Sequence, residues 1–249
     1  MVQSELGNRT AKLAQQQIPK ADVMVYVNIL AELYRHQGKY ALAEPLHVEC
    51  LQTRKTVLGK DHPHTIGSMN NLANLYLNQG KNAEAEPLFV ECLERSKIEL
   101  GADHPSTLLT MNNLAILYKN QGKHALAEPL YVKCLETQKT LLGADHPETL
   151  QSMSNLANLY DDIRKYEESE RLYVECLEKM KIVLGKNHKE TLSTMSNFAV
   201  LYCNQGKHAE AEALLVECLE RRKIVLGENH PETVMTQCKL FLASMMMRH

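Results

Sequence analysis

Apolar residues recur along this chain at the spacing of one helix face. Between residues 66 and 78 they stand three or four positions apart, which predicts an amphipathic helix. The residues of this stripe are Ile66, Met69, Leu72, Ala73 and Tyr76. Gly80 then interrupts the pattern, because glycine readily adopts the left-handed conformation that ends a helix. A second apolar stripe predicts another helix over residues 82–100, so the segment is predicted to be an antiparallel helical hairpin.

The same pattern repeats every 42 residues without an insertion. One alanine, one tyrosine, one glycine and one histidine keep this step through five consecutive segments. They are Ala31, Ala73, Ala115, Ala157 and Ala199; Tyr34, Tyr76, Tyr118, Tyr160 and Tyr202; Gly59, Gly101, Gly143, Gly185 and Gly227; and His62, His104, His146, His188 and His230. The predicted hairpins span residues 24–65, 66–107, 108–149, 150–191 and 192–233. Because a lone hairpin cannot bury its apolar stripe, the hairpins are predicted to stack into an all-α solenoid.

Both ends of the chain depart from this repeat. Residues 1–23 are predicted to form a partly helical or flexible N-terminal segment, and residues 234–249 a capping helix. In the capping helix Phe241 falls where the other hairpins have alanine, and the segment ends in Met245-Met246-Met247. We expect these residues to leave an apolar contact patch, the alternative being a frayed tail with scattered exposed methionines.

The loops that precede the first helices carry further recurring residues. Asp103 is expected to accept a backbone N–H at the helix start, and Pro105 suits the first helical turn. The loop histidines, one per hairpin, are explained by local hydrogen bonding, and no metal site is predicted. Arg164 occupies the turn position that glycine holds in the other hairpins, which predicts local strain or a changed hairpin angle.

Five of the seven cysteines also keep the 42-residue step. They are Cys50, Cys92, Cys134, Cys176 and Cys218. An identical position in every hairpin indicates a shared role as a small core residue. Corresponding helices of stacked hairpins lie about 8–10 Å apart, which is farther than a disulfide tolerates between Cα atoms. We therefore expect free thiols, also at Cys203 and Cys238.

Composition and charge exclude several classes of partner. The formal net charge of −2 gives no general attraction to phosphate backbones or anionic lipid, so neither nucleic acid nor membrane is expected. No apolar run resembles a signal peptide or reaches the length of a membrane span, and we expect a cytoplasmic protein. No nucleophile, base and orienting acid stand out as a set, so neither an enzyme nor a cofactor is predicted.

The repeat resembles the tetratricopeptide repeat. The phrase LGADHPSTLLTMNNLAILYKNQGKHALAEPLY, residues 100–131, is similar to the repeats of kinesin light chains and nephrocystin-like proteins. The phrase VNILAELYRHQGKYALAEPL, residues 27–46, resembles an early light-chain repeat. The resemblance covers residues 21–233. It implies a non-catalytic module that binds an extended peptide, or an adaptor or cargo protein, in a concave groove lined by the first helix of each hairpin.

Asparagines recur on these first helices, off the apolar stripe. Because asparagine is a middling helix former, its recurrence inside helices requires a reason. An amide both donates and accepts hydrogen bonds, so these side chains are candidate contacts for the backbone of a bound peptide. The alternative is that they bond neighbouring helices to each other. The candidates are Asn28, Asn70, Asn71, Asn74, Asn112, Asn113, Asn155, Asn158 and Asn197.

Two basic residues share a repeat position near the edge of the expected groove. Arg35 and Lys119 are candidates to attract an acidic peptide, whereas Asp161 at the same position of the fourth hairpin opposes it. The sequence thus favours a protein or peptide ligand. The alternative function is a structural scaffold that self-associates through its solenoid ends, as a homodimer through the C-terminal end.

Overall fold

The computed structural model describes residues 20–247, and this part of the chain is all α-helical. Residues 1–19 of the predicted N-terminal segment lie outside the described residues. The helices are α2 (Lys20–His36), α3 (Tyr40–Val57), α4 (Pro63–Asn78), α5 (Asn82–Glu99), α6 (Pro105–Asn120), α7 (His124–Leu141), α8 (Pro147–Asp162), α9 (Tyr166–Val183), α10 (Lys189–Asn204), α11 (His208–Leu226) and α12 (Pro231–Met246). Even-numbered helices are the predicted first helices, and odd-numbered helices are the second helices. The fold is an α-α solenoid, as predicted.

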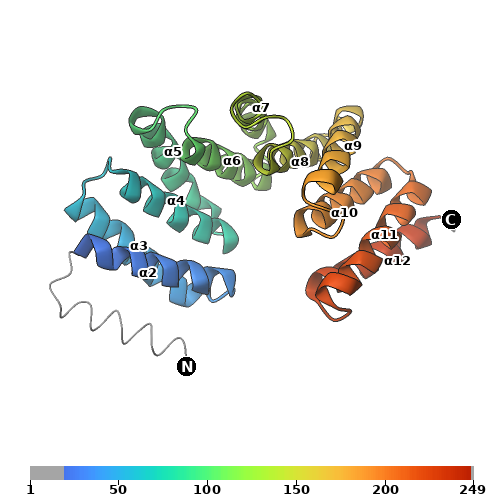
Figure 1. The fold of residues 1–249 in the computed structure, drawn as a ribbon, viewed down its shortest axis with the longest axis horizontal. Helices are drawn as coiled ribbons and strands as arrows, with labels where there is room; N and C mark the ends of the chain where they lie inside the picture. Colours follow the sequence, from blue (N-terminus) through green and yellow to red (C-terminus); the bar gives the residue numbers. More distant parts are fainter. Residues whose placement is uncertain (1–19, 248–249) are drawn as a thin grey trace. The chain divides into compact units, whose positions relative to one another are not determined.

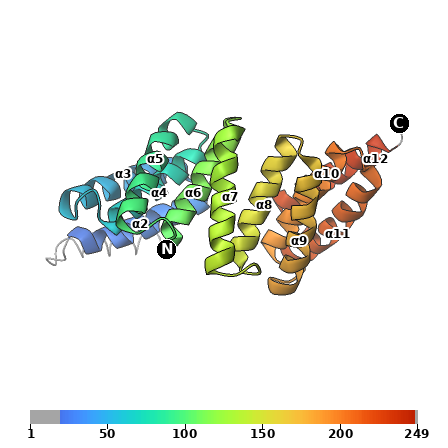
Figure 2. The same ribbon diagram turned by 90° about the horizontal axis from the view of Figure 1, so that it is seen from above.

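The chain forms two compact units. The N-terminal unit ends at Gly122 and contains α2–α6, whereas the C-terminal unit begins at Lys123 and contains α7–α12. Within each unit, successive helices pack side by side in chain order (Figure 1, Figure 2). The first helices also contact one another, α2 with α4, α4 with α6, and α8 with α10. Neighbouring first helices therefore lie next to each other in both units.

Small residues allow this close packing. The predicted alanine ladder is fully buried, and so are the five periodic cysteines. The thiol of Cys92 donates to the carbonyl oxygen of Ile66 at 3.4 Å, and that of Cys176 to the carbonyl oxygen of Leu150 at 3.1 Å. All seven cysteines are free thiols, as predicted. The sequence did not indicate that the periodic thiols also tie each second helix to its own first helix.

The starts of the first helices correct one prediction. The residue that caps each of α4, α6, α8, α10 and α12 is the loop histidine rather than the preceding aspartate. In α6 the Nδ1 atom of His104 accepts from the backbone N–H of Ser106 at 3.1 Å. Asp103 lies one residue too early to reach these N–H groups, so the aspartate prediction was wrong. Local bonding of the loop histidines is confirmed, and Pro105 begins α6 as predicted.

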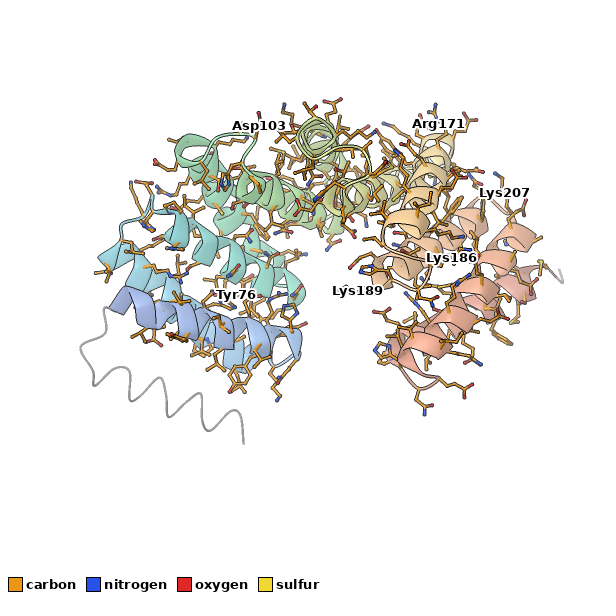
Figure 3. All side chains as sticks on the ribbon, viewed as in Figure 1. Tyr76, Asp103, Arg171, Lys186, Lys189 and Lys207 are labelled. Carbon is orange, nitrogen blue, oxygen red and sulfur yellow. The ribbon has the colours of Figure 1, made fainter. Side chains whose placement is uncertain are left out.

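A polar ladder on the second helices reinforces the stack. Glu44 on α3 accepts from Lys81 Nζ at 2.8 Å and from Gln79 Nε2 at 3.0 Å, both at the turn between α4 and α5. The hydrogen bond from Lys81 is the main cause that lowers the pKa of Glu44. Lys81 also lies 5.4 Å from the centre of the Tyr76 ring. In the C-terminal unit, Glu170, Gln205, Lys207 and Tyr202 form the same arrangement, and Figure 3 labels Tyr76 and Lys207.

The turn between α8 and α9 carries the predicted strain. Arg164 has a φ of 60°, and it is the only described residue besides glycine with a positive φ. The equivalent Gly80 and Gly206 have φ of 73° and 76°. A side chain in this left-handed region costs roughly 1–2 kcal/mol, because Cβ approaches the following carbonyl oxygen.

The last helix, α12, packs on α11 but leaves one face open. Thr236 and Ala243 are buried against the rest of the unit, whereas 64% of Phe241 is exposed. The exposed apolar residues also include Val234, Met235, Leu242, Met245, Met246 and Met247. These side chains form an exposed apolar patch on α12, and its role as a contact surface stays a prediction.

Candidate peptide-binding groove

The N-terminal unit contains a groove of about 670 Å³ on the face of its first helices. Residues of α2, α4 and α6 line it, together with Arg54 from α3 and Cys92 and Ser96 from α5. The polar residues that reach this groove include Asn28, Arg54, His64, Asn70, Asn71 and Thr110. Three of the nine predicted asparagines therefore meet in one cavity.

These asparagines are bonded to each other between neighbouring hairpins. Asn71 Nδ2 donates to Asn28 Oδ1 at 3.0 Å, which joins α4 to α2. Asn113 Nδ2 donates to Asn70 Oδ1 at 3.2 Å, which joins α6 to α4. Asn70 and Asn113 are buried, whereas Asn28 and Asn71 are half-buried. The bonding between helices that the sequence left open thus exists for both pairs, and peptide contact by the same amides stays a prediction.

The remaining candidate asparagines do not form one continuous ladder. Asn158 turns towards α9, where its Oδ1 accepts from the Tyr173 hydroxyl at 2.6 Å. Asn155 accepts from Gln151 Nε2, one turn earlier on the same helix, at 3.2 Å. Asn74 on α4, Asn112 on α6 and Asn197 on α10 are also half-buried. At the repeat position of Asn71, Asn113, Asn155 and Asn197, α12 carries a lysine, Lys239. Its Nζ donates to Ser196 Oγ at 3.0 Å.

The two predicted basic contacts differ in their surroundings. Arg35 is paired with Glu32, with 2.7 Å between Nη2 and Oε2. Burial raises the pKa of Glu32, but hydrogen bonds from His47 and Arg35 outweigh it and hold the value at about 2. The charge of Arg35 is therefore already compensated within α2, which weakens its predicted attraction for an acidic peptide. Lys119 is half-buried on α6.

A different arginine, missed by the sequence analysis, lies in the groove. Arg54 on α3 is only 6% exposed. Its Nη1 donates to Ser68 Oγ at 2.7 Å and to the His64 carbonyl at 3.2 Å, and its Nη2 donates to the Met24 carbonyl at 3.3 Å. All three acceptors are neutral. Within residues 20–247, no carboxylate pairs with Arg54, and its buried Nε has no hydrogen-bond partner.

The C-terminal unit holds the equivalent arginine in a compensated state. Arg222 on α11 is 5% exposed, and its Nη1 donates to Thr236 Oγ1 at 2.7 Å and to the Glu232 carbonyl at 3.0 Å. Its Nη2 also lies 3.1 Å from the Glu232 carboxylate. The repeat position of Glu232 is occupied by His64 in the N-terminal unit. The two arginines therefore share a hydroxyl and a carbonyl contact on the following first helix. They differ at Nη2, which reaches the Met24 carbonyl in Arg54 and the Glu232 carboxylate in Arg222.

No group of three or more potential metal-ligating side chains gathers within residues 20–247. None of the described helices combines the length and apolarity needed to cross a bilayer.

Comparisons with known proteins identify the repeat. A family model of the tetratricopeptide repeat matches residues 22–97, 64–140 and 107–182, and a second tetratricopeptide model matches residues 191–232. A comparison with curated protein sequences finds no significant match.

Solved structures show the same fold. Nearly identical TPR-like repeats of a P. anserina protein assigned as a kinesin light chain are 24% identical, with a TM-score of 0.70 over 83% of this chain and 98% of that chain. BtubC (BKLC) from P. vanneervenii is 24% identical, with a TM-score of 0.72 over 92% and 91%. NprR in complex with its cognate peptide NprX is 18% identical, with a TM-score of 0.66 over 97% and 66%. Because the repeat models match more than half of its length, the chain belongs to the tetratricopeptide repeat family, and the structures it resembles include kinesin-light-chain-like repeats.

Proposed function

We propose that this protein is a non-catalytic interaction module whose N-terminal unit binds an extended acidic segment of a partner protein. The observation that carries the proposal is the buried guanidinium of Arg54 in the groove, which reaches only neutral acceptors. Removing a charge from water is costly unless a counter-charge and hydrogen bonds compensate it. A carboxylate of the bound segment would supply both, through charge-assisted hydrogen bonds.

The neighbouring amides add contacts that do not depend on the side chains of the ligand. Asn28 and Asn71 lie in the same groove and share one hydrogen bond. Each amide carries two N–H groups and an oxygen, so this bond uses only part of their capacity. The rest serves the main chain of an extended peptide. An adaptor or cargo protein with an exposed acidic stretch therefore fits this groove.

A peptide array probed with the full chain tests this function. We expect acidic peptides to be retained, and the same peptides to be lost when each Asp or Glu becomes Asn or Gln. Preferential retention of basic or purely apolar peptides would contradict the proposal.

A variant with Asn71, Asn113 and Asn155 replaced by alanine examines the amides separately. We expect weaker peptide binding together with a small loss of stability, because Asn71 and Asn113 also join neighbouring helices. Unchanged peptide affinity in a variant that is shown by circular dichroism to be folded would assign these amides to structure alone.

Self-association through the C-terminal end is a second candidate function. It is favoured by the open face of α12, where Phe241, Leu242 and Met246 are more than half exposed. Light scattering across a concentration series should then show dimers that disappear with Leu242→Glu. A monomer at every concentration, with or without this substitution, would eliminate the candidate.

We also propose that the protein works in the cytoplasm. Its seven cysteines are free thiols, and Cys238 is exposed on α12. A reducing compartment keeps such a thiol from forming disulfides between copies. Fractionation of cells that express the protein tests this assignment. Recovery of the protein outside the cytosol would contradict it.

A further inference from the structure

The N-terminal end of the solenoid exposes a helix face that is covered in later hairpins. On α2, Tyr26 is 46% and Leu33 is 40% exposed. The residues at the Leu33 position of α4, α6, α8 and α10 are fully buried leucines, and those at the Tyr26 position are buried serines or threonines. What covers this face of α4, α6, α8 and α10 is the preceding second helix, α3, α5, α7 and α9 respectively.

The polar border of this face is also incomplete. Beside α4, the amide of Gln79 and the ammonium of Lys81 both bind Glu44, the fifth residue of the covering helix α3. Beside α10, Gln205 and Lys207 bind Glu170, the fifth residue of α9. The equivalent residues beside α2 are Gln37 and Lys39, and both are exposed. In the described part of the chain, no carboxylate lies within ion-pair distance of Lys39.

From this comparison of repeat positions we propose that the face of α2 that carries Tyr26 and Leu33 docks an α-helix of a partner protein. A glutamate in the second turn of that helix binds Gln37 and Lys39. The apolar side of that helix covers Leu33. This surface is separate from the groove proposed above, because the covering helix lies on the side of α2 that faces away from α4.

Tyr26 restricts which helix fits. At this repeat position Ser68 lies close to α3, with its Oγ 3.5 Å from Cys50 Sγ, so only a small side chain leaves room for a cysteine on the covering helix. A tyrosine fills that space. The docked helix therefore has glycine or alanine, rather than cysteine, opposite Tyr26.

A second copy of this chain is a poor occupant of the face. The chain's last second helix, α11, is already covered by α12. Its ladder glutamate, Glu212, accepts from Ser244 Oγ at 2.6 Å. Head-to-tail joining would require α12 to leave, so a helix from another protein is the better fit.

The direct test uses a labelled peptide with the sequence of α3, residues 40–57, in which Cys50 is replaced by glycine. Fluorescence anisotropy with the full chain should show saturable binding, and Glu44→Gln in the peptide should weaken it about fivefold. Lys39→Glu in the protein should abolish binding, and a peptide with Glu44→Lys should restore it. Arg54→Met, which alters the groove, should leave binding unchanged.

Two results would overturn the proposal. One is the absence of saturable binding, or a peptide affinity that neither Lys39→Glu nor Leu33→Glu changes in variants that keep their helicity. The other is a dimer in light scattering that Leu33→Glu dissociates, because the occupant would then be a second copy.

Discussion

Arg54 and Arg222 occupy the same repeat position in the N-terminal and C-terminal units. Each is buried, and each donates to a hydroxyl group and to a backbone carbonyl of the following first helix. Only Arg222 has a carboxylate, that of Glu232, within ion-pair distance. The difference arises from one residue, His64 in place of glutamate, and it shows how a repeat scaffold keeps its packing while the charge of a buried arginine is compensated in one unit and not in the other.

Of the substitutions considered, the one that gives Arg54 a neighbouring carboxylate should have the largest effect, and the quantity it changes is the affinity for acidic peptides. His64→Glu places a glutamate where Glu232 stands, and the new carboxylate pairs with Arg54. We expect acidic peptides to bind at least about tenfold more weakly, because this glutamate competes for the same guanidinium. Titration calorimetry measures the change. His64→Gln, which adds no charge, is the matched control, and equal affinities of the two variants would refute the competition.

Replacing each of the two arginines should also change the stability of the protein by a different amount. Arg54→Met removes a buried charge without a counter-ion, whereas Arg222→Met also leaves the half-exposed Glu232 without its partner. We expect Arg222→Met to be more destabilising than Arg54→Met by about 1 kcal/mol. Urea denaturation of both variants gives this difference. An equal loss would mean that the Glu232 carboxylate contributes nothing measurable.

The turns offer a further contrast between the units. Arg164 in the C-terminal unit takes the left-handed conformation that Gly80 takes in the N-terminal unit. Arg164→Gly should raise the free energy of unfolding by about 0.5–1 kcal/mol, and Gly80→Arg should lower it by a similar amount. Thermal unfolding followed by circular dichroism compares them. Destabilisation by Arg164→Gly would show that its side chain makes a compensating contact.

The periodic thiols should respond differently to alkaline pH. Burial raises the pKa of Cys176 to about 12, whereas hydrogen bonds from Thr110 and Ser96 oppose the effect of burial on Cys92. A pKa that is higher in the folded state contributes stability below the unfolded value, and this contribution is lost as the pH rises. Between about pH 7 and pH 9.5 we expect the wild type to lose roughly 0.8 kcal/mol more than Cys176→Ala. Cys92→Ala should reduce this pH-dependent loss of stability by less than Cys176→Ala does. A larger reduction by Cys92→Ala would contradict the environments described for the two thiols.

The fold was predictable from the sequence, whereas the groove was only partly so. Ladders such as Ala31 to Ala199 record a packing contact that every hairpin repeats, so their period fixed the solenoid and its hairpins. The asparagines were found for the same reason. Which amides bond to each other was not predictable, because the pairing depends on the offset between neighbouring first helices.

The sequence did not indicate a role for Arg54, because its repeat position does not keep one residue type from hairpin to hairpin. The same position carries Ser96, Gln138 and Met180 in the three following hairpins. An isolated arginine on a helix is usually a solvated surface residue, and its burial follows only from the packing of α3 on α4. The histidine caps were missed for a different reason, since aspartate is the commoner cap and precedes them directly.

A double-mutant cycle between Arg54 and one carboxylate of a bound acidic peptide tests the central claim most directly. Calorimetry would measure the affinity of the peptide and of its Glu→Gln form for the wild type and for Arg54→Met, with Arg222→Met as the control. We predict a coupling free energy of at least about 1 kcal/mol for Arg54 and none for Arg222. A coupling of zero at Arg54, with peptide binding intact, would contradict the account.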